Sequence, residues 1–216
     1  MYGLTLTLAI LICLLLAESL VKRSGKDINV LWGVALYSII GGIVGARLYH
    51  VMHLWNYYGD NPIKIFEIWN GGLGIFGALI GGLLGAVIYL KLKKEVVWEW
   101  LDIAGLVLPL GQVIGRWGNF FNRELYPYFL YESALDFLLF LALIYRHSTV
   151  KTPSSPKPGR TFALYLLGYS LIRFFLEPLR TDPWRIYNLN TAQLVSIILA
   201  GGALLILRRR NGVISQ

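Results

Sequence analysis

The chain has 216 residues, of which 56% are hydrophobic and only 15% are charged, and its mean hydropathy is +0.58. These values exclude an intrinsically disordered chain and lie outside the usual range of soluble globular domains. The net charge of +8 comes from short basic clusters between apolar runs rather than from one basic face, so it does not indicate a nucleic-acid partner. The pattern is typical of an integral membrane protein, with the lipid bilayer as its surroundings.

Seven apolar segments are long enough, or nearly so, to cross a bilayer, which takes about 20 residues of α-helix. They cover roughly residues 2–21, 29–53, 71–91, 98–119, 128–145, 161–177 and 191–207. The expected fold class is all-α, a polytopic integral membrane protein with seven transmembrane helices. Residues 1–216 are expected to form a single transmembrane domain, with a short outer interfacial segment at about 54–70 and a cytoplasmic linker at about 147–160.

The connections between the spans alternate in charge. Those after the first, third, fifth and seventh spans hold thirteen of the twenty Lys and Arg residues. The positive-inside rule then predicts an outer N-terminus and a cytoplasmic C-terminus. The first span has no basic start, and its basic residues follow the apolar run, so it is interpreted as a retained span rather than a cleaved signal peptide.

Three arginines lie near the ends of the outward-running second, fourth and sixth spans: Arg47, Arg116 and Arg173. A charge inside a span is costly and by default indicates a functional position. The same outer depth is expected for Tyr2, Asn119, Asn122, Glu124, Glu132, Glu177 and Arg180. Because arginine binds phosphate through paired hydrogen bonds, the set predicts a pocket for a phospholipid headgroup in the outer leaflet.

Other interpretations of these residues stay open. Any one arginine near a span end can simply extend its side chain to the interface, and Arg173 and Glu177 are four apart and can pair along one helix. Glycines recur every four residues in the third span, which favours close helix packing, while the Gly71-Gly72 pair at its start could bring the backbone close to a ligand. His50 and His53 have metal-ligand spacing, but no partner is evident, so no metal site and no cofactor are predicted.

Several motifs together resemble the prolipoprotein diacylglyceryl transferase family of bacteria. The central one is Gly-Arg-Trp-Gly-Asn-Phe-Phe-Asn-Arg-Glu-Leu-Tyr at 115–126. The others are Tyr-Gly at 2–3, Gly-Ala-Arg at 45–47, Asn-Gly-Gly-Leu-Gly at 70–74, Leu-Tyr-Glu at 130–132, Arg-Phe-x-x-Glu-x-x-Arg-x-Asp at 173–182 and Ala-Gln-Leu-Val-Ser at 192–196. The matches follow the family's order over nearly the whole chain.

The resemblance implies an enzyme of the bacterial cytoplasmic (inner) membrane, acting on its outer face. Such an enzyme moves a diacylglyceryl group from phosphatidylglycerol to the lipobox cysteine that follows the signal peptide of a prolipoprotein, and it releases glycerol phosphate. On the family's motifs, the expected catalytic residues are Arg116, Asn119, Arg173 and Tyr2. The expected substrate-binding residues are Arg47, Asn122, Glu124, Glu132, Glu177, Arg180, Gly71 and Gly72.

The chain departs from the family pattern in two places. Phe76 stands where many members carry a histidine, so no mechanism can use a base at this position. The segment between Tyr126 and Leu130 is shorter than the family's usual external loop. A non-catalytic phospholipid-binding homologue is therefore the alternative, whereas a transporter is disfavoured because the charges lie at one face rather than at the midplane.

Overall fold

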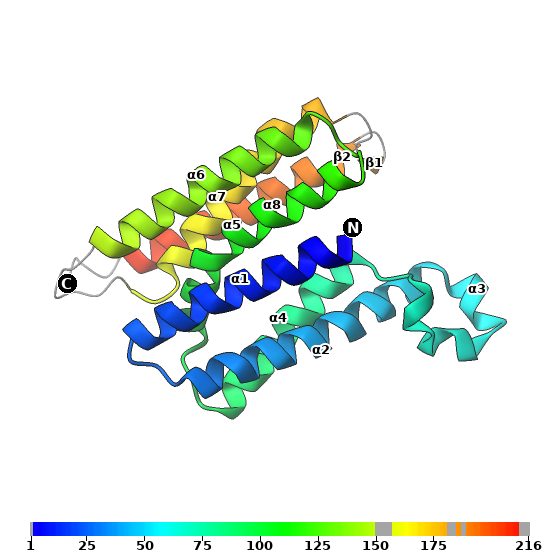
Figure 1. Ribbon diagram of the computed structural model, residues 1–216, viewed down its shortest axis with the longest axis horizontal. Coiled ribbons are helices and arrows are strands. Elements are labelled where there is room, and N and C mark those ends of the chain that lie inside the picture. The colour runs from blue at the N-terminus through cyan, green and yellow to red at the C-terminus, as the bar shows by residue number, and fades with distance from the viewer. Residues whose placement is uncertain (1, 150–156, 181–184, 187–188, 212–216) are drawn as a thin grey trace. The chain divides into compact units, whose positions relative to one another are not determined.

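A computed structural model describes residues 2–149, 157–180, 185–186 and 189–211. Seven long helices account for most of the chain: α1 (Tyr2–Arg23), α2 (Ile28–His53), α4 (Ile75–Leu92), α5 (Val97–Phe121), α6 (Tyr128–Thr149), α7 (Arg160–Leu176) and α8 (Thr191–Asn211) (Figure 1). All seven are long and apolar enough to cross a membrane. The expected all-α, seven-span fold class is confirmed.

Short elements fill two of the connections. Between α2 and α4 lie α3 (Trp55–Gly59) and the 3-10 helices η1 (Pro62–Phe66) and η2 (Ile68–Asn70). The 3-10 helix η3 (Glu177–Leu179) follows α7, and two antiparallel two-residue strands, β1 (Arg185–Ile186) and β2 (Leu189–Asn190), precede α8. These strands are too short to change the fold class.

Apolar side chains lie on the surface of these helices and several charged ones lie buried, as expected for helices that face lipid. Large apolar side chains are exposed along the helices; Leu4 is 61% exposed and Ile198 is 72% exposed. By contrast, Glu132 and Asp136 are both 0% exposed. Burying ionisable groups while exposing leucine is unfavourable in water but stable in hydrocarbon, which supports a membrane location for these helices.

The described chain divides into two compact units. The first contains residues 1–20 and 98–216, and the second contains residues 21–97. The expectation of a single transmembrane domain stays a prediction.

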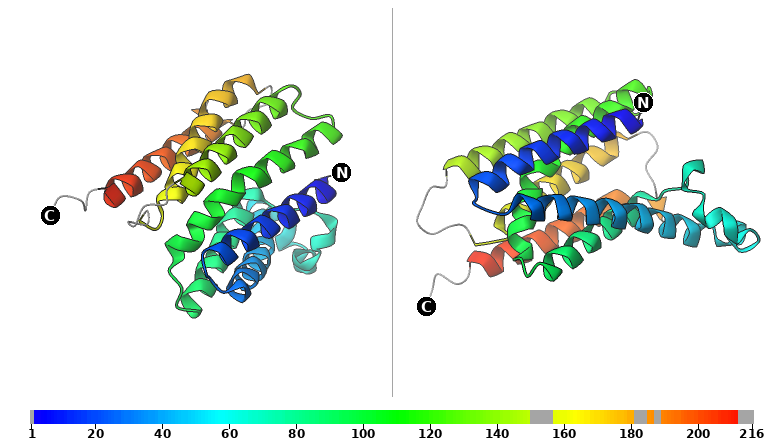
Figure 2. Two further views of the ribbon diagram at one scale, coloured as in Figure 1. Left: turned by 60° about the vertical axis from the view of Figure 1, so that its left-hand side comes forward. Right: turned by 60° about the horizontal axis from the view of Figure 1, so that its bottom comes forward.

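The second unit is built on the pairing of α2 with α4 (Figures 1 and 2). A Cβ at Gly81 would lie 2.1 Å from the Gly41 carbonyl oxygen, and one at Gly77 would lie 2.1 Å from that of Gly45. Only glycine on this face allows the two backbones to approach so closely, so the small-residue pattern of the sequence is a packing surface here.

The third span begins later than the sequence predicted. We expected it from residue 71, but α4 starts at Ile75. Gly71 and Gly72 have positive φ angles of 83° and 75°, which a right-handed helix does not allow.

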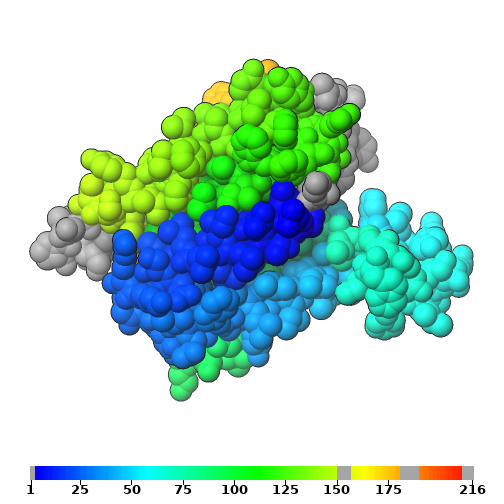
Figure 3. Space-filling model, in the orientation of Figure 1, coloured from blue at the N-terminus to red at the C-terminus, as the bar shows by residue number. Residues whose placement is uncertain are grey.

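The outer segment expected at 54–70 corresponds to α3, η1 and η2. Its side chains Phe66 and Trp69 are each 77% exposed. The segment is the cyan to teal part of Figure 3. Its position at the membrane interface stays a prediction.

In the first unit, α7 packs against α6 and α8. The start of α7 is held by α5, because Asp102 accepts hydrogen bonds from the main-chain N–H groups of Gly159 at 2.7 Å and Phe162 at 2.8 Å. A carboxylate suits this position, since the first N–H groups of a helix have no partner within the helix. The linker expected at 147–160 starts later than predicted, since α6 continues to Thr149; residues 150–156 lie outside the described part of the chain.

Candidate functional site

Three helices of the first unit bring their charged residues to one end. Arg116 lies in the last turns of α5 and Arg173 in the last turn of α7, while Glu132 lies in the second turn of α6, which runs in the opposite direction. The sequence predicted one membrane depth for these three residues. Within this unit they do lie together, at the same end of their helices.

Glu132 lies between the two arginines. Its Oε1 accepts a hydrogen bond from Arg116 Nη2 at 2.6 Å and from Arg173 Nη1 at 3.2 Å. The Glu132 side chain is fully buried, whereas those of Arg116 and Arg173 remain 26% and 13% exposed. Two guanidinium groups that reach the same oxygen atom can also reach one small anion. This arrangement is the geometric core of the candidate site.

Further contacts fix Arg173 in place. Its Nη1 donates to the Tyr128 hydroxyl at 2.5 Å, and its Nη2 lies 2.8 Å from Glu177 Oε2. The second contact is an ion pair by distance without hydrogen-bond geometry. Glu177 is 1% exposed and follows Arg173 by one turn, so the pairing considered from the sequence does form. Because Arg173 also reaches Glu132, the pairing does not exclude a role at the shared site.

Asp136 belongs to the same buried face of α6 and was missed by the sequence analysis. It follows Glu132 by one turn, is 0% exposed, and neither carboxyl oxygen has a hydrogen-bond partner among the described residues. The signal was present, because an acidic residue in the middle of an apolar span is a functional candidate in its own right.

The two asparagines of the central motif lie at the end of α5 and in the loop that follows it: Asn119 in the last turn of the helix and Asn122 just after it. Asn119 is 4% exposed, and its carbonyl accepts the N–H of Glu124 at 2.8 Å. Arg123 and Leu125 have positive φ angles of 57° and 54°, so the chain reverses direction sharply before α6. Asn119 thus lies inside the first unit near the end of α5, while Asn122 is half-buried and Glu124 is exposed.

Two other expected site residues lie at the edges of the described chain. Tyr2 is the first residue of α1, but its side chain lies outside the described residues. Arg180 follows η3 directly, and its N–H bonds to the Glu177 carbonyl at 3.1 Å. A place for Tyr2 and Arg180 beside Arg116 and Arg173 stays a prediction.

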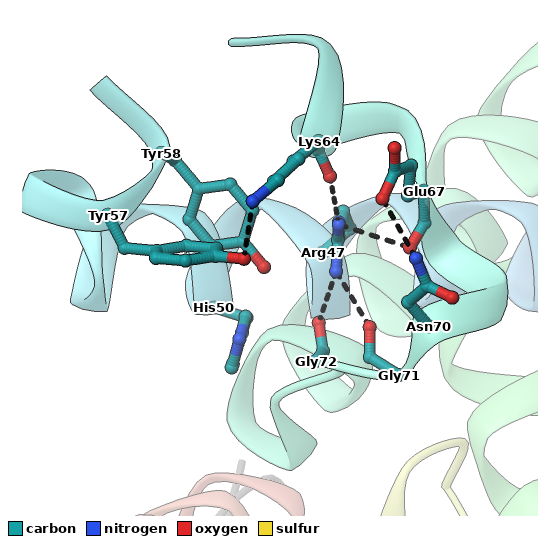
Figure 4. A pocket seen from close by; sticks show the side chains of 9 residues that line it. All are labelled: Arg47, His50, Tyr57, Tyr58, Lys64, Glu67, Asn70, Gly71 and Gly72. Atoms are coloured by element: carbon teal, nitrogen blue, oxygen red, sulfur yellow. Dashed lines mark hydrogen bonds between the residues drawn. The ribbon is translucent and has the colours of Figure 1, made fainter. Parts of the chain in front are cut away.

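Arg47, in the second unit, has a different environment (Figure 4). Its side chain is 7% exposed, and its guanidinium donates to main-chain carbonyls: to Ile65 at 2.8 Å, Gly71 at 2.7 Å, Gly72 at 3.2 Å and Glu67 at 3.3 Å, and also to Lys64. These bonds tie the segment between α2 and α4 to the end of α2. The contacts support a role for Arg47 in holding this loop, and its expected role in substrate binding stays a prediction.

A pocket of about 200 Å³ opens beside Arg47 (Figure 4). Its lining residues are Arg47, His50, Tyr57, Tyr58, Lys64, Glu67, Asn70, Gly71 and Gly72. A Cβ at Gly72 would lie 2.7 Å from the His50 ring and 2.8 Å from Arg47 Nη1. The sequence suggested that the backbone of this glycine pair comes close to a ligand; in the structure, the Gly72 backbone comes close to the Arg47 side chain. Lys64 Nζ donates to the Tyr57 hydroxyl at 3.0 Å, and this bond raises the pKa of Lys64.

One departure from the family pattern, Phe76, lies in the second unit. The Phe76 ring packs against that of Tyr49, with centroids 6.2 Å apart. The described residues contain no group of three or more His, Cys, Asp or Glu that could hold a metal, and His50 instead packs edge-on against Tyr58. Phe76 is thus part of an aromatic contact in the second unit.

The sequence matches known proteins over its whole length. The family model for prolipoprotein diacylglyceryl transferase covers residues 1–208. A protein of Symbiobacterium thermophilum is 38% identical, over 92% of this chain and 84% of its own length. Proteins of Trichormus variabilis (38%, over 97% of this chain and 86% of its own) and Halalkalibacterium halodurans (36%, over 100% and 84%) are similarly close. All three are named phosphatidylglycerol–prolipoprotein diacylglyceryl transferase. The resemblance seen in the motifs is confirmed, and the chain belongs to the prolipoprotein diacylglyceryl transferase family of bacterial multi-pass membrane transferases.

Proposed function

We propose that this protein transfers the diacylglyceryl group of phosphatidylglycerol to the thiol of a prolipoprotein cysteine. The observation that carries the proposal is the convergence of Arg116 and Arg173 on one oxygen of Glu132, at the end of a membrane-spanning unit. The names of the family and of its relatives supply the reaction class. The alternative, a non-catalytic lipid-binding homologue, is not favoured because those names agree on a transferase.

In the reaction, the cysteine sulfur attacks a glycerol carbon of the lipid, a C–S bond forms, and the C–O bond to the phosphate breaks. The electron pair of that bond leaves with glycerol phosphate, and the thiol proton must be transferred to an acceptor. Negative charge therefore grows on the phosphate oxygens. Arg116 and Arg173 would stabilise it, and fixed donors act more strongly in a site from which water is excluded.

The buried acids fix the positions of the two arginine side chains through ion pairs. Glu132 links Arg116 to Arg173, and Glu177 supports Arg173 from the following turn. Glu132 Oε2 has no hydrogen-bond partner among the described residues, so this carboxylate keeps one oxygen outside the contacts with the two arginines. Phe76 cannot accept the thiol proton, which distinguishes this chain from family members with a histidine there.

The remaining assignments follow the family motifs. Tyr2 and Asn119 act with the two arginines in catalysis. Substrate is held by Arg47, Asn122, Glu124, Glu132, Glu177, Arg180, Gly71 and Gly72. The enzyme lies in the bacterial inner membrane with its N-terminus outside, and it recognises the lipobox next to the prolipoprotein signal peptide. The charge alternation of the loops supports this orientation.

The test is transfer of label from phosphatidylglycerol, labelled in its acyl chains, to a synthetic lipobox peptide by the purified full chain. We expect a thioether-linked lipid on the peptide and release of glycerol phosphate. A peptide with serine in place of the lipobox cysteine is the control and should receive no label. Tight binding of phosphatidylglycerol without any transfer to the cysteine peptide would favour the non-catalytic alternative and overturn the proposal.

A further inference from the structure

The opposite end of the first unit is strongly basic. At this end α6 and α8 finish and α5 and α7 begin (Figures 1 and 2). Among the described residues, these turns hold two acids, Glu99 and Asp102. The same turns hold six cationic side chains: Arg146, Lys157, Arg160, Arg208, Arg209 and Arg210. Trp98 on α5 and Arg116 are eighteen residues apart, which separates them by about 27 Å along the helix, close to the thickness of the hydrocarbon core.

A pocket of about 370 Å³ opens at this end, lined by Trp98, Ile206, Arg209 and Arg210. The Arg210 guanidinium lies 5.1 Å from the centre of the Trp98 ring. The lining thus combines two guanidinium groups with an indole and an aliphatic wall. This combination suits a ligand that has a phosphate next to an apolar part.

Two buried cationic donors lie in the turn that packs on Trp98, although neither of their residues lines the pocket. Gly159 packs on Trp98, since a Cβ added there would lie 2.6 Å from the ring, and the turn that contains Gly159 also carries Lys157 and Arg160. Lys157 Nζ and Arg160 Nε are buried and have no hydrogen-bond partner among the described residues. Burying such donors is costly unless an anion pairs with them.

The nearby acid Asp102 does not supply that anion. Both of its carboxyl oxygens accept main-chain hydrogen bonds, one from Gly159 and the other from Phe162. Its charge therefore stabilises the start of α7, and the cationic side chains around the pocket exceed the acidic ones. The imbalance is the second observation, independent of the pocket's shape, that points to an anionic ligand.

We propose that this basic end binds the phosphate of an anionic phospholipid from the adjacent leaflet. Arg209 and Arg210 contact the phosphate, while Trp98 and Ile206 lie against the glycerol and the first acyl carbons. Lys157 and Arg160 add charge from the neighbouring turn. The site is separate from the arginine pair that faces the substrate, so the proposal goes beyond the transferase function and does not depend on it.

The test measures binding of phosphatidic acid to the full-length protein in a zwitterionic detergent, by native mass spectrometry at a series of lipid concentrations. Arg209→Gln/Arg210→Gln removes both phosphate ligands. Near a membrane surface each cation contributes on the order of 1 kcal/mol, so binding should weaken about 30-fold. The matched control is Lys22→Gln/Arg23→Gln, which removes the same charge from the end of α1 and should bind as wild type does.

The outcomes separate the competing explanations. Unchanged binding by the Arg209/Arg210 variant, or an equal loss in the control, would overturn the site, the latter by showing a general effect of surface charge. Displacement of the lipid by inorganic phosphate at equal concentration would overturn the lipid assignment in favour of a free anion. If the double glutamine variant does not fold, Arg209→Lys/Arg210→Lys keeps the charge, removes the planar forks, and should still lower the affinity. Transfer to the lipobox peptide should persist in every variant, so loss of this site and failure of the proposed enzyme function are distinguishable.

Discussion

At the scale of single residues, Glu132 and Asp136 show how differently two buried acids can behave on one helix. Both are fully buried on α6, one turn apart. Glu132 bonds to two arginines, whereas Asp136 has no hydrogen-bond partner among the described residues. Because an unpaired buried charge is costly, the partners of each acid decide what its removal does.

Glu132→Gln should destabilise the protein, because it removes the charge that holds two like-charged guanidinium groups together. Breaking a buried ion pair typically costs about 3–5 kcal/mol. The matched variant Asp136→Asn makes the same chemical change at the same burial and should not lower the thermal unfolding temperature. Thermal unfolding in detergent measures both. Equal loss of stability in the two variants would show that the arginine contacts do not determine the difference.

Arg116→Lys should reduce transfer by about 10²–10³-fold while the protein still folds. Lysine keeps the charge but lacks the planar fork that reaches Glu132 and a phosphate together. The range is the usual cost of removing one preorganised donor. Arg123→Lys, an exposed change in the adjoining loop, is the control. Near-normal turnover by Arg116→Lys would mean that Arg116 only extends to the interface.

At the scale of elements, close packing and helix capping position the helices. The packing of α2 on α4 depends on glycines that let the two backbones come into contact. The start of α7 is capped by a carboxylate from α5. Neither contact uses a large apolar side chain. In lipid, where apolar surface gains little from helix association, close backbone approach and satisfied hydrogen bonds are the forces that remain.

Gly81→Ala should lower the thermal unfolding temperature, because the new Cβ would meet the Gly41 carbonyl oxygen at 2.1 Å. The control is Gly201→Ala in α8, where a Cβ meets nothing within 4 Å. Alanine has a higher helix propensity than glycine by about 1 kcal/mol, so the control should be neutral or stabilising. Opposite signs in the two variants are the expected result. A neutral Gly81→Ala would mean that α2 and α4 do not pack on this face.

Asp102→Ala should loosen the start of α7, because two main-chain donors would lose their acceptor. Losing a cap of this kind costs about 1–2 kcal/mol. Asp102→Asn keeps one acceptor oxygen and should lose less. Hydrogen–deuterium exchange over residues 157–165 reads out the local effect, with exchange in α2 as the internal reference. Unaltered exchange at the start of α7 in Asp102→Ala would contradict the capping role.

At the scale of the whole molecule, seven spans and alternating loop charge define the topology expected for the chain. An impermeant thiol reagent added from outside should label a cysteine at Asn61 but not one at Lys94 or Ser154, after Cys13 has been replaced by alanine. The reason is that basic loops are retained on the cytoplasmic side. Labelling after membrane permeabilisation confirms that all three sites are reactive. Labelling of position 94 from outside would reverse the orientation.

The sequence by itself determined the number of spans, the fold class and the family. These depend on local properties: the length and hydropathy of each segment, and motifs read along the chain. It also indicated that Arg116 and Arg173 share a membrane depth, because depth follows from position along a span. It did not indicate that α4 starts at Ile75, since the backbone of Gly71 and Gly72 is set by bonds from Arg47.

Only the tertiary structure decided which groups meet. Arg47, Arg116 and Arg173 look alike in sequence, but Arg47 is enclosed by carbonyl groups of its own unit, while the other two share Glu132. It also placed Asp136 on the same buried face as Glu132. Hydropathy reports how a residue interacts with lipid or water, which is a property of one segment. Partners depend on which helix faces come together, and that is set by glycine contacts and caps between segments far apart in the chain.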